Sequence, residues 1–347
     1  MKELGQVICS LRETTTPGVL ATLSHVFGSS YRRVGARLLW RPEGALLGSI
    51  SGGCLEADLI ERAARVHREG RADCVVYDTT EENDMVWGVG LGCHGIVHVL
   101  LEPVSGVPDA LATVAAAWAR REAAVIVTRY QAGGNQRLGT LPEAPSPVVA
   151  EAVTRAHREQ RSQHVTDDGS SYFIEYAPPP VSLTLFGAGE DARPLAALAA
   201  ELGWRIRVVD PRAAFATTAR FPQADAVLVA SPESAATLPF DPWSVAVVMT
   251  HHYRFDLPLL RALLPRALPY LGLLGPKLRA ERLLSDLRKE GLVPTAEMLV
   301  RLHAPVGLDL GAGTPEAVAL CVIAEIQSVL TGRNARPLRE RTQPINA

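Results

Sequence analysis

Midway along the chain, a short apolar strand leads directly into a glycine turn and an amphipathic helix. The residues Ser182–Phe186 precede Gly187-Ala188-Gly189-Glu190-Asp191-Ala192, which fits the pattern G-x-G-x-x-A. In such a turn the first glycine, Gly187, allows the tight bend, and the second, Gly189, lets the backbone approach a phosphate. The small third residue, Ala192, lets helix and strand pack closely. This segment therefore restricts the downstream half to an α/β fold built from strand–turn–helix units.

The residues after this turn repeat the same alternation. Helical patterns separate most of five short apolar runs, which are Ser182–Phe186, Arg205–Asp210, 226–230, 245–250 and 268–273. Strands alternating with helices predict a doubly wound parallel sheet of the Rossmann type. The triplet Pro178-Pro179-Pro180 cannot continue a helix or a central strand. We therefore expect a linker at 178–181, a Rossmann-like domain at 182–330 and a polar tail at 331–347.

Upstream of the linker the pattern is mixed. Apolar runs indicate strands at 37–40, 45–50, 96–101, 123–128 and 171–176. Helical spacing indicates helices from Leu55, at 109–121 and at 146–160. The sequence therefore predicts an N-terminal mixed α/β (α+β) domain over residues 1–177.

Composition excludes several functional classes. The 347 residues carry a formal net charge of -2, which disfavours nucleic acid as the main partner. No apolar run approaches the roughly 20 residues of a membrane span, and no secretory signal is visible, so we expect no membrane association. The five cysteines have irregular spacing without a C-x-x-C pair, which indicates free thiols in a reducing cytoplasm.

Polar residues at strand ends are candidates for a nucleotide site. Asp210 closes the strand after the glycine turn, where an acidic residue can accept a hydrogen bond from a ribose hydroxyl. His251 and His252 follow another strand, and we expect only one of them to face a site. Glu190 favours a packing role for the turn, because its carboxylate repels a pyrophosphate unless it points away.

Two glycine-rich segments each end near a cysteine. In Ser51-Gly52-Gly53-Cys54 the thiol stands at the expected N-terminus of a helix, where the helix dipole and free N–H groups suit a thiol that binds metals or reacts; the alternative is a buried, inert cysteine. The second segment, Gly88–Gly95, places Cys93 and His94 directly after Gly92. Its four glycines favour a loop around a ligand, although a plain connector is the alternative. We expect the remaining cysteines to lie in the core: Cys9, Cys74 and Cys321.

A third segment, Gly28-Ser29-Ser30-Tyr31-Arg32-Arg33, is small, polar and basic. Its hydroxyls and the guanidinium groups of Arg32 and Arg33 suit an anionic group, and a solvated loop is the alternative. The residues alone leave both interpretations open.

Taken together, these segments resemble the XdhC/CoxI family of xanthine dehydrogenase accessory factors, and the likeness covers nearly the whole chain. The N-terminal half carries the 28–33 segment, SGGCLE at 51–56 and GLGCHG at 90–95. The C-terminal half carries FGAGEDA at 186–192, VVDPR at 208–212, MTHHYRFD at 249–256, YLGLLGPKLRA at 270–280 and the 304–326 segment. The sequence departs from the family at Glu190, often histidine, and at His94, often glycine.

The resemblance implies a cytoplasmic chaperone that binds molybdenum cofactor, as molybdopterin or its dinucleotide form. Such a protein protects the cofactor while a cysteine desulfurase supplies its terminal sulfur. It then passes the cofactor to an apo-molybdoenzyme of the xanthine dehydrogenase or carbon monoxide dehydrogenase type. By this likeness Cys54 and Cys93 contact the cofactor and its molybdenum.

An alternative from a different class is an NAD(P)-dependent oxidoreductase that uses the Rossmann-like domain. In that case NAD(P) or another nucleotide occupies the glycine turn, and Cys93 and His94 act on a substrate. The soft thiol ligands favour the carrier, because they suit a metal dithiolene better than a hydride acceptor. We also expect a homodimer, the commonest soluble oligomer.

Overall fold

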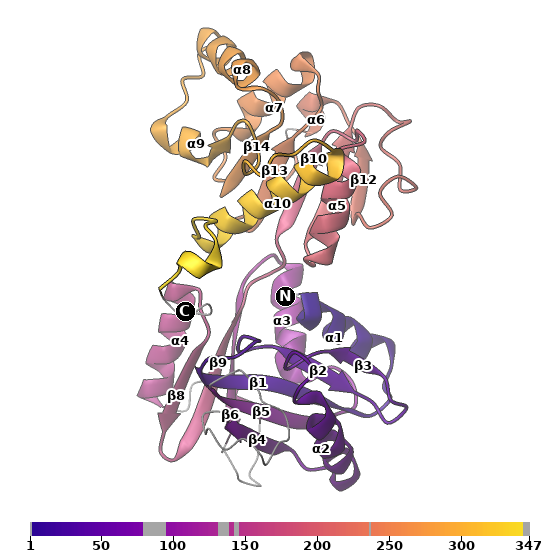
Figure 1. Cartoon of the computed structure of the whole chain (residues 1–347), viewed down its shortest axis with the longest axis vertical. Helices are drawn as coiled ribbons and strands as arrows, with labels where there is room; N and C mark the ends of the chain where they lie inside the picture. The colour runs from indigo at the N-terminus through magenta and orange to yellow at the C-terminus, as the bar shows by residue number, and fades with distance from the viewer. Residues whose placement is uncertain (1, 79–94, 131–138, 142–145, 236, 343–347) are drawn as a thin grey trace. The chain divides into compact units, whose positions relative to one another are not determined.

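A computed structural model describes residues 2–78, 95–130, 139–141, 146–235 and 237–342. The chain divides into two compact units, and Pro180–Glu340 form the second of them (Figure 1). The residues before Pro180, together with the end of the chain from Arg341, form the first. Each unit is described below by itself.

The N-terminal unit contains a five-stranded sheet whose neighbouring strands all run antiparallel, in the order β3-β2-β1-β5-β4. Its strands are β1 (Gly18–Gly28), β2 (Arg37–Trp40), β3 (Leu46–Gly48), β4 (Asp73–Asp78) and β5 (Gly95–Val104). Helix α2 (Glu56–Glu69) packs on one face, and helices α1 (Lys2–Glu13) and α3 (Asp109–Ala119) pack on the other. Both faces are therefore covered, which explains why most of β1 is buried on both sides.

The same unit holds a four-stranded antiparallel sheet in the order β7-β6-β9-β8. Its strands are β6 (Ala124–Tyr130), β7 (Gly139–Leu141), β8 (Gln163–Asp167) and β9 (Ser170–Ala177), and helix α4 (Pro147–Glu159) covers one face. Arg37 of the first sheet and Glu175 of the second form a buried ion pair through two hydrogen bonds of 2.8 and 2.5 Å. This pair ties the two sheets together.

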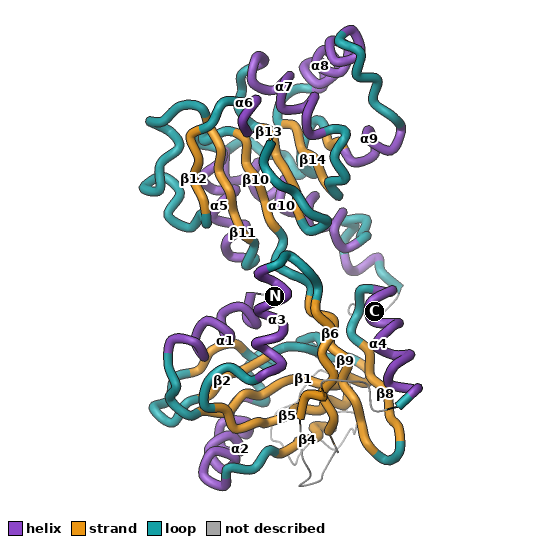
Figure 2. Tube along the Cα trace, turned by 180° about the vertical axis from the view of Figure 1, so that it is seen from behind, coloured by secondary structure: helices purple, strands orange, loops and turns teal. Residues whose placement is uncertain are grey.

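The C-terminal unit is a six-stranded parallel sheet in the order β12-β11-β10-β13-β14-β15 (Figure 2). Its strands are β10 (Ser182–Phe186), β11 (Arg205–Asp210), β12 (Ala226–Val229), β13 (Ser244–Val248), β14 (Tyr270–Leu273) and β15 (Leu302–His303). Its helices are α5 (Ala192–Glu201), α6 (Pro232–Ala235), α7 (Tyr253–Leu263), α8 (Lys277–Lys289), α9 (Ala296–Arg301) and α10 (Pro315–Thr331), followed by a short 3-10 helix at Leu338–Glu340. The order reverses between β10 and β13, which is the topological switch point of an open α/β sheet.

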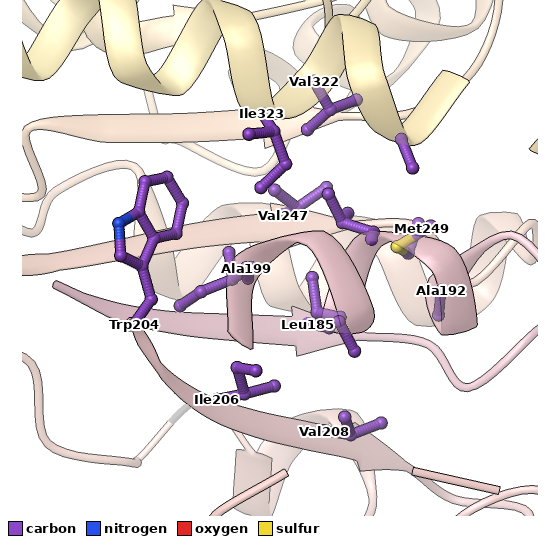
Figure 3. Close-up of a cluster of buried hydrophobic side chains, with 14 of the residues drawn as sticks. Leu185, Ala192, Ala199, Trp204, Ile206, Val208, Val247, Met249, Val322 and Ile323 are labelled. Atoms are coloured by element: carbon purple, nitrogen blue, oxygen red, sulfur yellow. The ribbon is translucent and has the colours of Figure 1, made fainter. Parts of the chain in front are cut away.

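Side chains of each central strand alternate between the two faces of this sheet. Leu183 and Leu185 of β10 face α5 and α10, whereas Phe186 belongs to the core beneath α7 and α8. Figure 3 shows the first of these cores, where Val322 and Ile323 of α10 lie close to Val247. Helices on both faces and a buried parallel sheet are the structure expected of a doubly wound fold.

The predicted fold class is confirmed: a mixed α/β N-terminal unit precedes a Rossmann-type parallel sheet. Strands Ser182–Phe186 and Arg205–Asp210 have the predicted bounds. The sequence patterns did not reveal α1, β1, β4 or β8. The helices that the structure describes lack the length and apolar character of a membrane-spanning segment.

Candidate functional site

Gly28 and Gly95, which belong to two of the predicted N-terminal motifs, face each other at one end of the five-stranded sheet. Gly28 ends β1 directly opposite Gly95, which begins β5. A side chain at Gly95 would place its Cβ 2.2 Å from the carbonyl oxygen of Ser29, so only glycine fits there. Cys93, His94 and Gly92 lie outside the described residues, and their chain enters the described part at Gly95.

Hydrogen bonds within the Ser51–Glu56 segment stabilise the loop that precedes α2. Glu56 accepts hydrogen bonds from the backbone N–H groups of Ile50 and Ser51 at 3.2 and 2.8 Å and from the Ser51 hydroxyl. The Ser51 oxygen in turn accepts from the N–H groups of Gly53 and Leu55, both at 3.1 Å. Burial raises the pKa of Glu56, but these bonds outweigh it, and its pKa is lowered overall. The loop is therefore preorganised by its own side chains.

The middle residues of this preorganised loop are exposed to solvent. Gly52, Gly53 and Cys54 are exposed, and Gly53 adopts φ +114°, a conformation that favours glycine. The backbone N–H groups of Gly52 and Cys54 have no hydrogen-bond partner in the described part of the chain. Cys54 precedes α2, which begins at Glu56, so the thiol stands at a helix N-terminus and points to solvent rather than into the core. The loop can therefore offer a thiol and free N–H donors to one ligand.

The basic segment and the glycine-cysteine loop lie against each other. Arg32 donates to the Ser49 hydroxyl at 3.1 Å and pairs with the Glu3 carboxylate at 2.5 Å. The Tyr31 ring lies beside Gly52, within 3.7 Å of the position of an added Cβ. A cavity of about 350 Å³ adjoins this contact. Its polar and aromatic lining includes Glu3, Tyr31, Arg32, Arg33, Ser162, Glu175 and Tyr176.

Three histidines form a cluster that the sequence patterns did not reveal. His25 of β1 stacks on His164 of β8 with ring centroids 3.9 Å apart, and it faces His98 of β5 edge-on at 5.2 Å. Tyr130 lies 2.9 Å from the Nε2 atom of His164. Burial lowers the pKa of all three imidazoles, that of His164 to about 4. The three imidazoles are therefore neutral near pH 7. Local sequence patterns could not reveal the cluster, because His25 and His164 are 139 residues apart in the sequence.

The glycine turn of the C-terminal unit has the expected backbone. Gly187 adopts φ +123°, and a Cβ there would lie 2.5 Å from the carbonyl oxygen of Met249. Ala192 is fully buried at the start of α5, where it packs in the core. Both residues are thus fixed by packing between β10, β13 and α5.

Asp210 lies at the predicted strand end, but its carboxylate faces the turn. It accepts a hydrogen bond of 2.8 Å from the Ala188 N–H and three bonds from Arg212. The side chain is only 1% exposed. Burial raises the pKa of Asp210, but the bonds from Arg212 and Ala188 outweigh it and lower the pKa. This carboxylate stabilises the turn and its neighbouring arginine.

The other polar residues of the turn are paired. Glu190 points to Arg193 and Arg220, at 2.9 and 2.8 Å, which lower the pKa of its exposed carboxyl. His251, whose Nε2 lies 2.6 Å from the Asp191 carboxylate, is exposed; the His252 ring packs on Phe255. The sequence patterns drew attention to Glu190 and His251 but missed Asp191. Its signal was a second carboxylate within the glycine motif.

The prediction that Cys9 lies in the core is wrong. Helix α1 buries Leu4, Val7, Ile8 and Leu11, and Cys9 falls on the opposite, exposed face. Its thiol donates to Glu13 at 3.3 Å, and this bond raises its pKa. Cys74 and Cys321 are buried as predicted. Within the described part of the chain, no group of three histidine, cysteine or acidic residues is arranged to hold a metal ion.

Comparisons with known proteins agree with this organisation. A family model described as the XdhC and CoxI family matches residues 11–78, and one described as the XdhC Rossmann domain matches residues 183–326. A probable xanthine dehydrogenase subunit from Bacillus subtilis is 35% identical over 332 residues, covering 91% of this chain and 94% of the relative. The molybdenum cofactor insertion chaperone PaoD of Escherichia coli is 26% identical, covering 90% and 83%.

A solved structure shares both units. It is described as a xanthine dehydrogenase from Bacillus halodurans and is 30% identical to this chain. The two superimpose with a TM-score of 0.78, over 98% of this chain and 99% of the other.

Proposed function

This chain belongs to the XdhC and CoxI family, and on that premise we propose that its N-terminal unit carries molybdenum cofactor as cargo. The observation that carries the proposal is the contact between the Arg32 segment, which follows β1, and the loop that carries Cys54. The name of the chaperone PaoD, a relative over most of its length, supports a role in cofactor maturation.

The residues present suit this cargo. An exposed thiol matches the soft metal–sulfur chemistry of a molybdenum dithiolene. Free backbone N–H groups and a guanidinium suit a phosphate, and they stand in the Gly52–Cys54 loop and at Arg32. Cys54 and, by the sequence motif alone, Cys93 are the proposed molybdenum contacts. Gly52, Gly53, Gly92, His94 and Arg33 complete the proposed cofactor-binding set.

We further propose the steps that surround this binding. The protein protects the cofactor while a cysteine desulfurase supplies its sulfur, and then delivers it to an apo-molybdoenzyme of the xanthine dehydrogenase type. The name of the Bacillus subtilis relative supports this client class. Both molybdopterin and its dinucleotide form are compatible with an anion site at Arg32. We propose that the protein acts in these steps as a homodimer in the cytoplasm.

The geometry favours this carrier over an NAD(P)-dependent oxidoreductase. An NAD site needs an acidic residue open to the ribose, but Asp210 is buried against Ala188 and Arg212. The exposed thiol and the open loop lie in the other unit. We therefore assign cargo binding to the N-terminal unit.

A transfer assay tests the proposed function. The protein is purified from a host that synthesises molybdenum cofactor, and is then mixed with a cofactor-free xanthine dehydrogenase. We expect copurified molybdenum and pterin, and activation of the enzyme that scales with the loaded carrier added. If the purified protein contains neither molybdenum nor pterin and does not activate the cofactor-free enzyme, the carrier role is refuted.

A further inference from the structure

Asp191 occupies an unusual place in the glycine turn. It stands at the N-cap of α5, where an aspartate ordinarily accepts a hydrogen bond from the first turn of the helix. Here its side chain makes no such bond. Instead its Oδ1 atom lies 2.8 Å from the position that a Cβ on Gly189 would take. The carboxylate thus covers the second glycine of the motif.

That position has a defined role in turns that bind dinucleotides. The second glycine is kept small so that the backbone can approach the pyrophosphate. In this chain the space beside Gly189 holds the chain's own anion. The Oδ1 atom is buried and has no hydrogen-bond partner among the described residues, a costly state for a carboxylate oxygen.

His251 holds the Asp191 carboxylate in this place. Its Nε2 atom lies 2.6 Å from Asp191 Oδ2, across the switch point between β10 and β13. His251 adopts φ +57°, which is uncommon for a residue other than glycine. The preceding residue, Thr250, is anchored by a bond of 2.5 Å to the buried Asp256, which also accepts from Arg279. The histidine is therefore presented by a fixed loop.

We propose that Asp191, clamped by His251, is a specificity-determining residue that closes this Rossmann-type turn to the pyrophosphate of a dinucleotide. The carboxylate already supplies the negative charge that the N-terminus of α5 favours. An incoming pyrophosphate meets this anion at close range and must displace it from His251. Since the Asp210 carboxylate is committed to Ala188 and Arg212, it is not free to accept a hydrogen bond from a ribose hydroxyl.

The proposal is independent of cargo binding in the other unit and is tested by a gain of binding. Inorganic pyrophosphate is the primary probe because it needs only the turn, and ADP-ribose is the second. Isothermal titration compares the full-length wild type with Asp191→Ala and with His251→Asn, which tolerates a positive φ. Glu190→Gln is the matched control: it removes a charge from the next residue, whose carboxylate points to Arg193 and Arg220.

We expect Asp191→Ala to bind inorganic pyrophosphate at least about tenfold more tightly than the wild type, whose binding should be too weak to saturate. His251→Asn should give a smaller gain because it releases the carboxylate without removing it. Glu190→Gln should resemble the wild type. Tight pyrophosphate binding by the wild type would overturn the proposal. So would an Asp191→Ala variant that folds, by circular dichroism, yet binds no better than Glu190→Gln.

Discussion

The guanidinium of Arg32 donates to the hydroxyl oxygen of Ser49 at a distance of 3.1 Å. Through this bond the basic segment after β1 meets the loop that carries Cys54, although the two residues are 17 positions apart in the sequence. The bond brings into contact two motifs that the sequence patterns identified only as separate segments. It brings a guanidinium to the segment that carries an exposed thiol, and these two groups suit the phosphate and the metal–sulfur centre of the proposed cargo.

Replacing Arg32 with alanine should lower the molybdenum content of purified protein about tenfold while leaving the fold intact. Its ion pair with Glu3 is partly buried, with 28% of the Arg32 side chain exposed, and an ion pair that still reaches solvent contributes about 1 kcal/mol or less to stability. Arg68→Ala, at the exposed end of α2, is the matched control and should retain its cargo. Metal analysis and thermal melts of both variants make the comparison. Equal retention by both would remove Arg32 from the site.

Ser51→Ala should disorder the Cys54 loop. The substitution removes the acceptor for the N–H groups of Gly53 and Leu55 and a donor to Glu56. Leaving these groups unpaired costs about 1–3 kcal/mol. We expect a lower free energy of unfolding in urea together with a loss of cargo. Thr166→Ala, on β8, is the control. If Ser51→Ala retains as much cargo as the wild type, the order of this loop is unimportant for cargo binding.

Acid should destabilise the N-terminal unit through the histidine cluster. The folded-state pKa of His164 is about 4, below its ordinary value of 6.5, so the unfolded chain binds more protons between these values. The stabilising contribution is therefore complete above pH 6.5 and is lost as pH falls toward 4. His164→Gln should weaken the decline in melting temperature between these pH values, and the exposed His157→Gln should not. Parallel pH profiles for His164→Gln and wild type would contradict this account.

Asp210→Ala should destabilise the C-terminal unit whether or not any nucleotide is present. The buried carboxylate accepts from Ala188 and Arg212, and loss of such charge-assisted bonds costs about 2–3 kcal/mol. Urea denaturation measures the difference. Glu233→Ala, on the exposed start of α6, should change the free energy of unfolding by less than about 0.5 kcal/mol. If Asp210→Ala has a similarly small effect, the hydrogen bonds of Asp210 make no net contribution to the free energy of unfolding.

Regular periodicity explains which parts of the fold could be predicted. The parallel strands are short apolar runs separated by helices, and β10 and β11 were located to the residue. Strand β1 was missed because both of its faces are buried, so it lacks the alternation of a half-exposed strand. Cys9 was misplaced because its apolar neighbours in sequence, Val7 and Ile8, lie on the other face of α1.

The candidate site was predictable only in its parts. Glycines with cysteine or arginine indicated loops around an anionic ligand, but not that Arg32 would reach Ser49. The Asp191–His251 pair joins residues 60 positions apart, and the arrangement depends on which strands are neighbours in the sheet. Such contacts arise from tertiary structure, which local patterns do not encode.

The most direct test of the central claim is the molybdenum and pterin content of cysteine variants purified from a cofactor-producing host. Cys93→Ala should lose nearly all cargo, and Cys54→Ala should lose a large part of it. Cys9→Ala, which removes another exposed thiol from α1, and the buried Cys74→Ala should retain wild-type content. Circular dichroism should show the same fold in all four variants. If Cys93→Ala and Cys54→Ala both keep full cargo and still activate a cofactor-free xanthine dehydrogenase, the thiols are not its ligands and the proposed site is wrong.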